Sequence, residues 1–381
     1  MRPIRLAMIG GGPDAFIGGV HRMAARLDGH FALVAGAFSS DPEKSASMAG
    51  ELNLDPERCY PDFATMAASE AAREDGAEAV AIVAPNQVHF DAAMACLDKG
   101  LPVICDKPLT TDLGKAKRLA DAVSRTGIPF FVTYNYSGYP LVRQMREMVS
   151  EGVLGTIRGV HVEYVQDWLA EPIEQSGQKQ AGWRTDPVAT GGAGATGDIA
   201  THAYHLMRFV SGLRVEELGA DLSSLVPGRV VDDDARILLR LEGGARGMLW
   251  ASQIAHGNTN GLRLRIFGEE GGLEWHQQNP EELTFAARGQ PPQIVRRGGP
   301  EAEAAGSRLP PGHPEGFVEA FGTLYCEAAE GIRAWQAGGP GNSASVPGID
   351  DGVEGVAFVD AVLRSSANNA AWTKIEEHPN G

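Results

Sequence analysis

Two short segments combine chemically versatile side chains with neighbours that restrict or expose the backbone. The first is Asp106-Lys107-Pro108, which directly follows the apolar run Val103–Cys105. A lysine at the carboxyl end of a parallel strand points toward a ligand crevice, and the proline restricts the backbone beside it. The alternative is an ordinary solvent-exposed lysine at the end of a strand. The position of Lys107 directly before Pro108 favours the functional interpretation.

The second segment is rich in glycine and histidine and runs from Gly191 to His205. If a helix begins near Asp198, then Asp198, His202 and His205 are at i, i+4 and i+7 and share one face. An imidazole, whose ordinary pKa lies close to neutral pH, suits proton transfer. Three structural alternatives stay open: Asp198 as a helix N-cap, His202 as a hydrogen-bonded core histidine, and all three side chains as ligands of a metal ion.

A glycine-rich turn near the N-terminus could hold a dinucleotide. The apolar run Ile4–Ile9 ends in Gly10-Gly11-Gly12, and Ile17–Leu27 follows with helical spacing. Small residues let the backbone approach a pyrophosphate, and the start of a helix supplies N–H donors to it. Gly10 and Gly12 fit the expected spacing, but the third glycine, Gly18, comes three residues late. The order strand, glycine turn, helix favours dinucleotide binding over a plain turn.

The end of the second strand distinguishes NAD from NADP in such a domain. An acidic residue there accepts hydrogen bonds from the ribose hydroxyls and repels a 2′-phosphate. The chain has Ser39, Ser40 and Asp41 at this place, of which the serines suit either cofactor and the aspartate favours NAD. Lys44, one helical turn further on, could meet a phosphate, although a solvated helix face is the simpler interpretation. The sequence predicts NAD and leaves NADP open.

Strands alternate with helices over the first third of the chain. Strands are predicted at Ile4–Ile9, Phe31–Phe38, Ala79–Val83, Val103–Cys105 and Phe130–Thr133. This order is typical of βαβ units and of a parallel sheet covered on both faces, as in a Rossmann domain. From about residue 156, alternating segments predict one large, mostly antiparallel open sheet, at Ile157–Tyr164, Ile237–Leu241, Gly247–Ala251 and Arg263–Phe267. We therefore predict an α/β protein with a dinucleotide-binding Rossmann domain at 1–133, a substrate-binding and oligomerisation α/β domain at 134–381, and the site between them.

Length, charge and cysteine content narrow the class of protein. A chain of 381 residues suits two domains. The net charge of -16 disfavours binding to nucleic acid. No stretch approaches the apolar length of a membrane span, and the first apolar run is too short for the core of a signal peptide. The four cysteines include no CxxC pair, which favours a reducing, cytoplasmic compartment.

Taken together, these segments resemble the Gfo/Idh/MocA oxidoreductase family, named for glucose–fructose oxidoreductase, inositol dehydrogenase and a rhizopine catabolism protein. Asp106-Lys107-Pro108 is similar to the family's Glu-Lys-Pro motif, with Asp in place of Glu. Gly197-Asp198 through His202 is similar to its Gly-Asp-x-x-x-His motif. The resemblance extends over nearly the whole chain and includes Pro85-Asn86-Gln87-Val88-His89, Trp183-Arg184, His313–Tyr325 and Asp350–Ser366.

The resemblance implies a role for each matching residue. Lys107 would hold the reacting hydroxyl and lower its pKa, His202 would take its proton as general base, and Asp198 would fix a second hydroxyl or orient the histidine. Cofactor contacts are expected from Gly10, Gly12, Phe16, Ile17, Ser39, Ser40, Pro85, Asn86, His89, Asp106 and Lys107. Substrate contacts are expected from Lys107, Tyr134, Asn135, Trp183, Arg184, Asp198, His202 and His205. No metal is expected, because hydride transfer needs none once a lysine is present.

The predicted function is NAD(P)-dependent oxidation of a secondary hydroxyl on a cyclitol, sugar or glycoside. In relatives the free face of the open sheet pairs subunits, which implies a homodimer or homotetramer. Two departures bear on ligand contacts: the glycine loop is longer, and His205 stands where many relatives carry Asp or Asn. Two other functions stay open, a dinucleotide-binding sensor without turnover and a dihydrodiol-type dehydrogenase. A lysine together with a base argues against the sensor, and a pocket of Asp, His, Arg and Trp favours polyhydroxylated substrates.

Overall fold

The computed structural model describes residues 1–13, 15–300, 307–341 and 345–376. These residues form two compact units, and each is described by itself. The first unit comprises Met1–Asn135 and Val318–Val353, and the second comprises Tyr136–Phe317 and the described residues from Glu354 on. The division after residue 133 stays a prediction as a boundary between independently folding domains. No feature of the sequence predicts that Val318–Val353 returns to the first unit.

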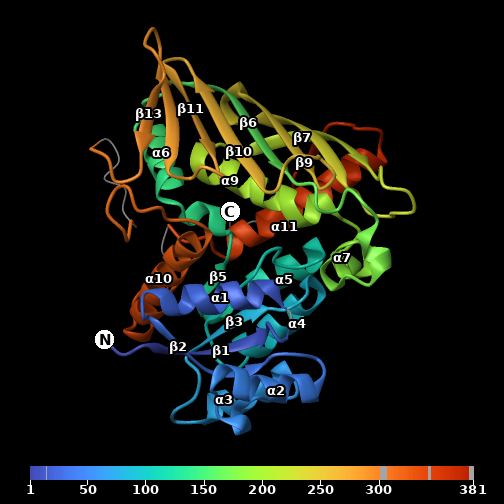
Figure 1. Ribbon diagram of the computed structural model, residues 1–381, viewed down its shortest axis with the longest axis vertical. Helices are drawn as coiled ribbons and strands as arrows, with labels where there is room; N and C mark the ends of the chain where they lie inside the picture. The colour runs from blue at the N-terminus through green and yellow to red at the C-terminus, as the bar shows by residue number, and fades with distance from the viewer. Residues whose placement is uncertain (14, 301–306, 342–344, 377–381) are drawn as a thin grey trace. The chain divides into compact units, whose positions relative to one another are not determined.

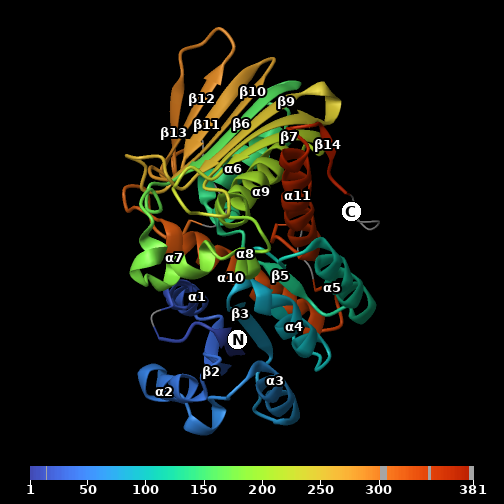
Figure 2. The ribbon, with the colours of Figure 1, turned by 90° about the vertical axis from the view of Figure 1, so that its right-hand side faces the viewer.

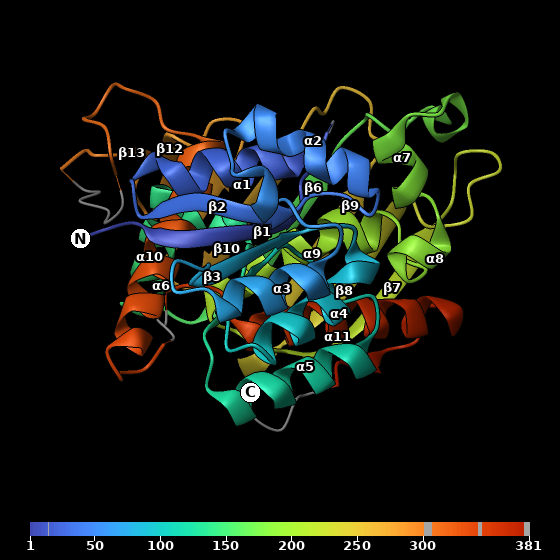
Figure 3. The ribbon, with the colours of Figure 1, turned by 90° about the horizontal axis from the view of Figure 1, so that it is seen from below.

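The first unit contains a parallel sheet with the strand order β2-β1-β3-β4-β5. Its strands are β1 (Ile4–Gly10), β2 (Phe31–Ala37), β3 (Ala79–Val83), β4 (Val103–Cys105) and β5 (Phe130–Val132). The helices are α1 (Phe16–Leu27), α2 (Pro42–Leu52), α3 (Phe63–Ala72), α4 (Asn86–Leu97), α5 (Leu113–Thr126) and most of α10 (Phe317–Gln336), with a 3-10 turn, η1, at Pro56–Arg58. Helix α1 lies on one face of the sheet and α4 and α5 on the other (Figure 3). The Rossmann arrangement is confirmed.

Sequence signals set these elements locally. All five residues of β3 are buried, as expected for a strand covered on both faces. Asp41, Asp62 and Asp112 each accept hydrogen bonds from backbone N–H groups at the first turn of α2, α3 and α5. Gly127 ends α5 in the left-handed conformation, which a glycine adopts without steric cost. The caps of Asp41 and Asp112 thus fix the ends of the loops that follow β2 and β4.

The second unit contains a larger sheet with the strand order β13-β12-β11-β10-β6-β9-β8-β7-β14. All neighbouring strands are antiparallel except β6 and β9. The strands are β6 (Ile157–Val165), β7 (Val215–Ser223), β8 (Asp234–Leu241), β9 (Arg246–Ser252), β10 (Gly261–Gly268), β11 (Gly271–His276), β12 (Glu282–Ala287), β13 (Gln293–Arg296) and β14 (Thr373–Lys374). The prediction of a large, mostly antiparallel sheet is confirmed.

Helices cover one face of this sheet. They are α6 (Pro140–Ser150), α9 (Thr201–Ser211) and the greater part of α11 (Ile349–Ala367), which lie along the same side in two views (Figures 1 and 2). The remaining helical turns are η2 (Asn135–Gly138), η3 (Ile173–Ser176), α7 (Lys179–Arg184), α8 (Pro187–Thr190), η4 (Thr196–Ala200) and η5 (Glu242–Gly244). None of the helices in the described residues is long and apolar enough to cross a membrane.

The other face of the sheet carries apolar side chains that remain exposed. Along β8, Ile237 and Leu239 are buried, whereas Leu238 between them is 55% exposed. Leu238 pairs across the strands with Met248, and Met248 pairs in turn with His161. The ring of His161 packs against that of Phe267. Because side chains alternate between faces along a strand, these residues form one row on the face away from α9.

Candidate active site

The glycine turn after β1 is shaped for close backbone approach. Gly10 and Gly11 have φ angles of +84° and +73°, a region that favours glycine. A Cβ on Gly12 would lie 2.6 Å from the carbonyl oxygen of Phe38, and a Cβ on Gly18 would lie 2.3 Å from the Cα of Gly11. Gly18, the third glycine of the motif, therefore lets the start of α1 pack against the turn. Sequence reasoning counted Gly10 and Gly12 but did not single out Gly11, the partner of Gly18.

The start of α1 has no side-chain cap. Its N-cap residue, Ala15, makes no side-chain hydrogen bond to the first turn. Phe16 is largely exposed, and Ile17 is half-buried beside it. Backbone N–H groups at the start of a helix attract phosphate. A glycine turn followed by an uncapped helix start is typical of sites that bind a pyrophosphate.

The acidic residue after β2 is engaged as a helix cap. Asp41 accepts hydrogen bonds from the N–H groups of Glu43 and Lys44, at 3.0 and 3.4 Å, and its carboxylate lies 3.6 Å from the Lys44 ammonium. The hydroxyl of Ser39 accepts a hydrogen bond from the Asp41 N–H group at 3.1 Å. Ser39 and Ser40 thus remain the candidate ribose contacts, while Asp41 shapes the turn that carries them.

At the end of β4, Asp106 is tied to the chain around it. Its Oδ1 accepts hydrogen bonds from the Lys107 N–H group at 2.9 Å and from the Thr133 hydroxyl at 3.0 Å. The peptide bond between Lys107 and Pro108 is cis. The ring nitrogens of His89 lie 2.9 and 2.8 Å from the carbonyl oxygens of Pro108 and Ala84. His89 therefore links the loop after β3 to the Lys107 segment, while Asn86 is buried at the start of α4.

A second buried histidine stands behind this segment. His21 of α1 is fully buried, and its Nδ1 lies 2.8 Å from the hydroxyl oxygen of Tyr325 in α10. Its Nε2 is 4.0 Å from Asp106 Oδ1. Burial lowers the pKa of His21 to about 4, although the nearby carboxylate opposes the shift. The ring is neutral at physiological pH and joins α1, α10 and the end of β4.

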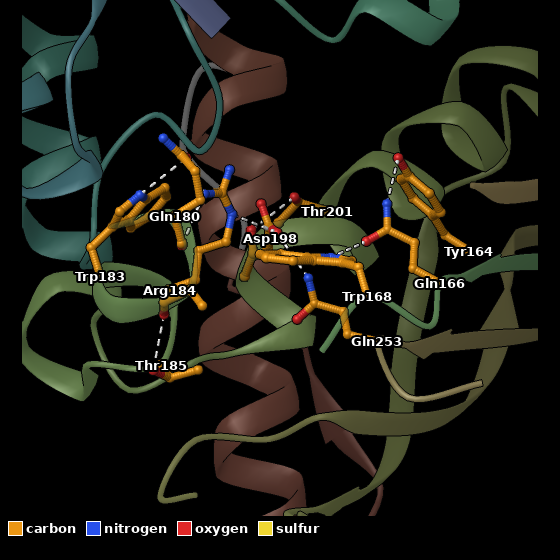
Figure 4. Close-up of polar contacts among 12 residues, drawn as sticks. Tyr164, Gln166, Trp168, Gln180, Trp183, Arg184, Thr185, Asp198, Thr201 and Gln253 are labelled. Atoms are coloured by element: carbon orange, nitrogen blue, oxygen red, sulfur yellow. Dashed lines mark hydrogen bonds and ion pairs between the residues drawn. The ribbon is translucent and has the colours of Figure 1, made fainter. Parts of the chain in front are cut away.

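In the second unit, Asp198 is held by two donors from different elements. Arg184 Nε donates to Asp198 Oδ2 at 3.0 Å, and Gln253 Nε2 donates to the same oxygen at 2.9 Å (Figure 4). The Arg184 guanidinium lies over the indole of Trp183, 4.1 Å from the ring centroid, and 5.8 Å from that of Trp168. The expected Asp198, Trp183 and Arg184 thus belong to one cluster. Gln253, directly after β9, and Trp168 were not predicted to belong to this cluster.

Asp198 lies in a turn of π-helix, η4, which continues directly into α9. The sequence predicts an ordinary helix from Asp198 on, so the π-turn is a correction. A π-helix has about one more residue per turn than an α-helix, and apolar periodicity over five residues does not reveal this difference. The Asp198 side chain is about one-sixth exposed at 16%, whereas His202 and His205 of α9 are buried.

The ring of His202 packs against two tyrosines. Its centroid lies 4.9 Å from that of Tyr136 and 6.1 Å from that of Tyr164. Tyr164 donates to Asn260 Oδ1 at 2.7 Å, so its oxygen accepts from Tyr136 at 2.5 Å, and Asn260 Nδ2 donates back to the Tyr136 oxygen at 3.3 Å. These three side chains form a closed ring of hydrogen bonds beside the candidate base.

This network continues to the indole near Asp198. Gln166 Nε2 donates to Asn260 Oδ1 at 2.8 Å, and Trp168 Nε1 donates to Gln166 Oε1 at 2.9 Å.

Three other predicted substrate residues, Tyr134, Asn135 and His205, are also buried. The ring of His205 stacks on Phe209, with centroids 5.7 Å apart. Tyr134 and Asn135 are buried at the end of the first unit. In the described part of the chain, no group of three or more His, Cys, Asp or Glu side chains could hold a metal ion.

Comparison with known proteins agrees with the two units. A family model described as an oxidoreductase family with an NAD-binding Rossmann fold matches residues 4–134, and the Gfo/Idh/MocA C-terminal domain matches residues 142–274. An uncharacterized oxidoreductase, YfiI of Bacillus subtilis, is 35% identical over 98% of both chains. Levoglucosan dehydrogenase of Pseudarthrobacter phenanthrenivorans is 28% identical over 99% of both.

Solved structures give the same result. The inositol dehydrogenase homolog of Azotobacter vinelandii, complexed with NAD+, is 38% identical, covers 98% of this chain and 97% of its own, and has a TM-score of 0.93. The same homolog has also been solved with NADH and myo-inositol. The family model and these relatives show that the protein is an NAD-dependent oxidoreductase that acts on CH–OH groups. The chain belongs to the Gfo/Idh/MocA oxidoreductase family.

Proposed function

We propose that this protein oxidises a secondary hydroxyl of a cyclitol, free sugar or glycoside, with NAD as hydride acceptor. The observation that carries the proposal is the cluster around Asp198. Its carboxylate is balanced by the Arg184 guanidinium, and amide and indole groups surround the pair. Such a cluster offers hydrogen bonds and flat apolar surface without net charge, which suits a neutral polyhydroxylated ring. Myo-inositol and levoglucosan, which appear in the names of relatives, are rings of this class.

The proposed roles follow the family motifs. Lys107 holds the reacting hydroxyl and lowers its pKa, and His202 accepts the hydroxyl proton as general base. Asp198 binds a second hydroxyl or orients His202. Further substrate contacts are assigned to Tyr134, Asn135, Trp183, Arg184 and His205. When NAD is bound, its nicotinamide supplies the hydride acceptor.

The cofactor contacts are also proposals. The phosphates lie on the glycine turn and the start of α1, where a Cβ on Gly12 or Gly18 would clash. The remaining contacts are assigned to Phe16, Ile17, Ser39, Ser40, Pro85, Asn86, Asp106 and Lys107. His89 contributes by holding the Lys107–Pro108 segment through its two ring nitrogens.

A substrate panel tests the proposal. Purified protein is mixed with NAD or NADP and with inositols, monosaccharides, anhydrosugars and aromatic dihydrodiols, and reduced nicotinamide is followed by its near-ultraviolet absorbance. Reduction of NAD with a polyol supports the proposal. Reduction only with dihydrodiols would reassign the substrate, and dinucleotide binding without any turnover would favour a sensor.

We further propose a homodimer or homotetramer, formed through the open face of the large sheet and present in the cytoplasm. The row of exposed apolar residues that includes Leu238 and Met248 supports this surface. Light scattering of Leu238→Glu is expected to show smaller particles than the wild type. Leu225→Glu, at an exposed site outside the strands, is the matched control. An unchanged mass for Leu238→Glu would exclude this face as the interface.

A further inference from the structure

The π-turn that carries Asp198 begins without a cap of its own. Its N-cap residue, Ala195, has no side chain that can accept hydrogen bonds from the first turn. Turns of π-helix are rare and short, and they persist where surrounding groups stabilise them, frequently at functional sites. The donors at the start of η4 therefore need acceptors from elsewhere in the second unit.

One buried carboxylate, that of Asp232 just before β8, supplies these acceptors. Asp232 Oδ1 accepts from the Gly194 N–H group at 2.6 Å, and Oδ2 accepts from the N–H group and the hydroxyl of Thr196, both at 2.7 Å. The carbonyl oxygen of Asp232 accepts from the Ala195 N–H group at 2.8 Å. Four donors on three successive residues thus end on a single residue.

The packing leaves little freedom for this arrangement. A Cβ on Gly194 would lie 2.0 Å from the carbonyl oxygen of Asp232, so the two backbones approach as closely as glycine allows. Asp232 is only 6% exposed. Burial raises its pKa, while the hydrogen bonds from Thr196 and Gly194 act in the opposite direction. A buried carboxylate is costly unless donors satisfy it, and all of these donors belong to the start of one turn.

The segment just before β8 that contains Asp232 also helps to hold the Asp198 side chain. The Asp198 N–H group donates to the Gly194 carbonyl at 3.0 Å. Gly194, which Asp232 holds through its N–H group, is therefore hydrogen-bonded directly to the candidate catalytic residue. Gln253, which binds the Asp198 carboxylate, donates its own N–H group to the Asp233 carbonyl at 2.9 Å. The Asp232 side chain thus holds the backbone before Asp198, whereas Asp233 takes part only through its backbone carbonyl, which a change of the Asp233 side chain leaves in place.

We infer that Asp232 is a positioning residue for the oxidation reaction, which acts through the π-turn on Asp198 and, through the helix that continues from it, on His202. The inference rests on the proposed function for its kinetic consequence. Its structural part, the hold on residues 194–196, does not depend on the substrate. Misplacement of a reacting group by about 1 Å can cost about 10²-fold in rate.

The test compares Asp232→Asn with Asp233→Asn. Asp233 is also buried, and its carboxylate accepts from the N–H groups of Leu225 and Val226 and pairs with Arg229, with no hydrogen bond to η4. Asp232→Asn is expected to lower kcat by about 10²-fold with a smaller change in KM. Asp233→Asn is expected to lower the melting temperature and to keep kcat.

Two further readouts separate positioning from general stability. Hydrogen exchange of the peptide 194–204 is expected to accelerate in Asp232→Asn and to stay slow in Asp233→Asn. The kinetic isotope effect with ring-deuterated myo-inositol is expected to rise in Asp232→Asn, because a misaligned hydride transfer becomes rate-limiting. Thr196→Val, which removes one of the three bonds to the carboxylate, is expected to lie between wild type and Asp232→Asn, and Thr196→Ser is expected to match wild type.

Several results would overturn the inference. These are a folded Asp232→Asn variant with wild-type kcat, an equal loss of kcat in Asp233→Asn, or unchanged exchange of the 194–204 peptide. If Asp232→Asn does not fold, wild-type exchange and kcat in Thr196→Val would refute the inference equally well. If the wild-type protein turns over no polyol, the proposed function fails, while the exchange comparison still decides whether Asp232 holds the π-turn.

Discussion

Replacing Gln253 by leucine removes one of the two donors that hold the Asp198 carboxylate. Gln253 as a residue is 2% exposed, and its side-chain amide donates to Asp198 Oδ2 at 2.9 Å, while Arg184 remains as the second donor. Leucine is close to glutamine in size, so the change removes the hydrogen bond and keeps most of the packing. The backbone N–H group of residue 253 still reaches the Asp233 carbonyl.

The expected loss follows from the charge of the acceptor. A hydrogen bond to a charged group contributes about 1.5–3 kcal/mol, more than a bond between neutral groups. Each 1.4 kcal/mol corresponds to about one factor of ten, so kcat/KM is expected to fall by about 10- to 100-fold. The lower end applies if the partly exposed carboxylate gains a bond to water in exchange.

Steady-state kinetics with NAD and the best polyol of the panel measures this loss. Gln277→Leu is the matched control, because its amide donates to the Tyr139 hydroxyl at 3.4 Å and does not contact Asp198. The control is expected to keep wild-type kcat/KM. The reasoning is refuted if a folded Gln253→Leu protein keeps wild-type kcat/KM, or if Gln277→Leu loses as much.

The remaining predictions concern the motif residues, the glycine turn and acid stability. Lys107→Ala and His202→Ala are each expected to abolish turnover while NAD still binds, which calorimetric titration and initial rates check together; near-normal turnover in either would show that the assigned role is wrong. Gly18→Ala is expected to weaken NAD binding at least about 10-fold, because its Cβ would meet the backbone of Gly11 at 2.3 Å. Gly19→Ala would meet only the end of the Arg22 side chain, at 4.0 Å, and is expected to bind NAD normally. Between pH about 4 and 6.5 the unfolded chain binds a proton at His21 that the folded protein excludes, so stability falls as pH is lowered through this window, by up to about 3 kcal/mol. His21→Asn is expected to flatten the fall in melting temperature over that window, and an unchanged slope would contradict the burial argument.

Hydrophobic patterning predicts the first sheet closely because its strands are short and buried. The predicted Ala79–Val83 and Val103–Cys105 coincide with β3 and β4 at both ends. The outer strands of the second sheet are harder to find, since β11 opens with two glycines and β12 has only Leu283 fully buried among half-buried neighbours. Weak alternation at a sheet edge gives no clear signal before the register is known.

The candidate site shows the same limit at the level of single residues. Trp183, Arg184 and Asp198 come together as the motifs predict, because they stand close in sequence. Gln253 and Asn260 reach the cluster and the tyrosine pair from 55 and 96 residues away. Their positions depend on the pairing of β6, β9 and β10, which no local spacing encodes. Asp41 is the converse case, since its chemistry favours a ribose contact and its geometry makes it a cap.

The run Asp232-Asp233-Asp234 shows why residues that support a site are easily overlooked in a sequence. Three successive acids in a sequence are usually taken for a solvated loop. Here each is buried and serves a different element: Asp232 binds the start of η4, Asp233 binds the 225–229 turn, and Asp234 accepts from Trp250 Nε1 at 3.0 Å. Because these neighbouring acids contact different elements, one short run ties several loops to the sheet. An acidic run directly before an alternating strand therefore deserves inspection as a structural frame for a site, as well as a surface charge.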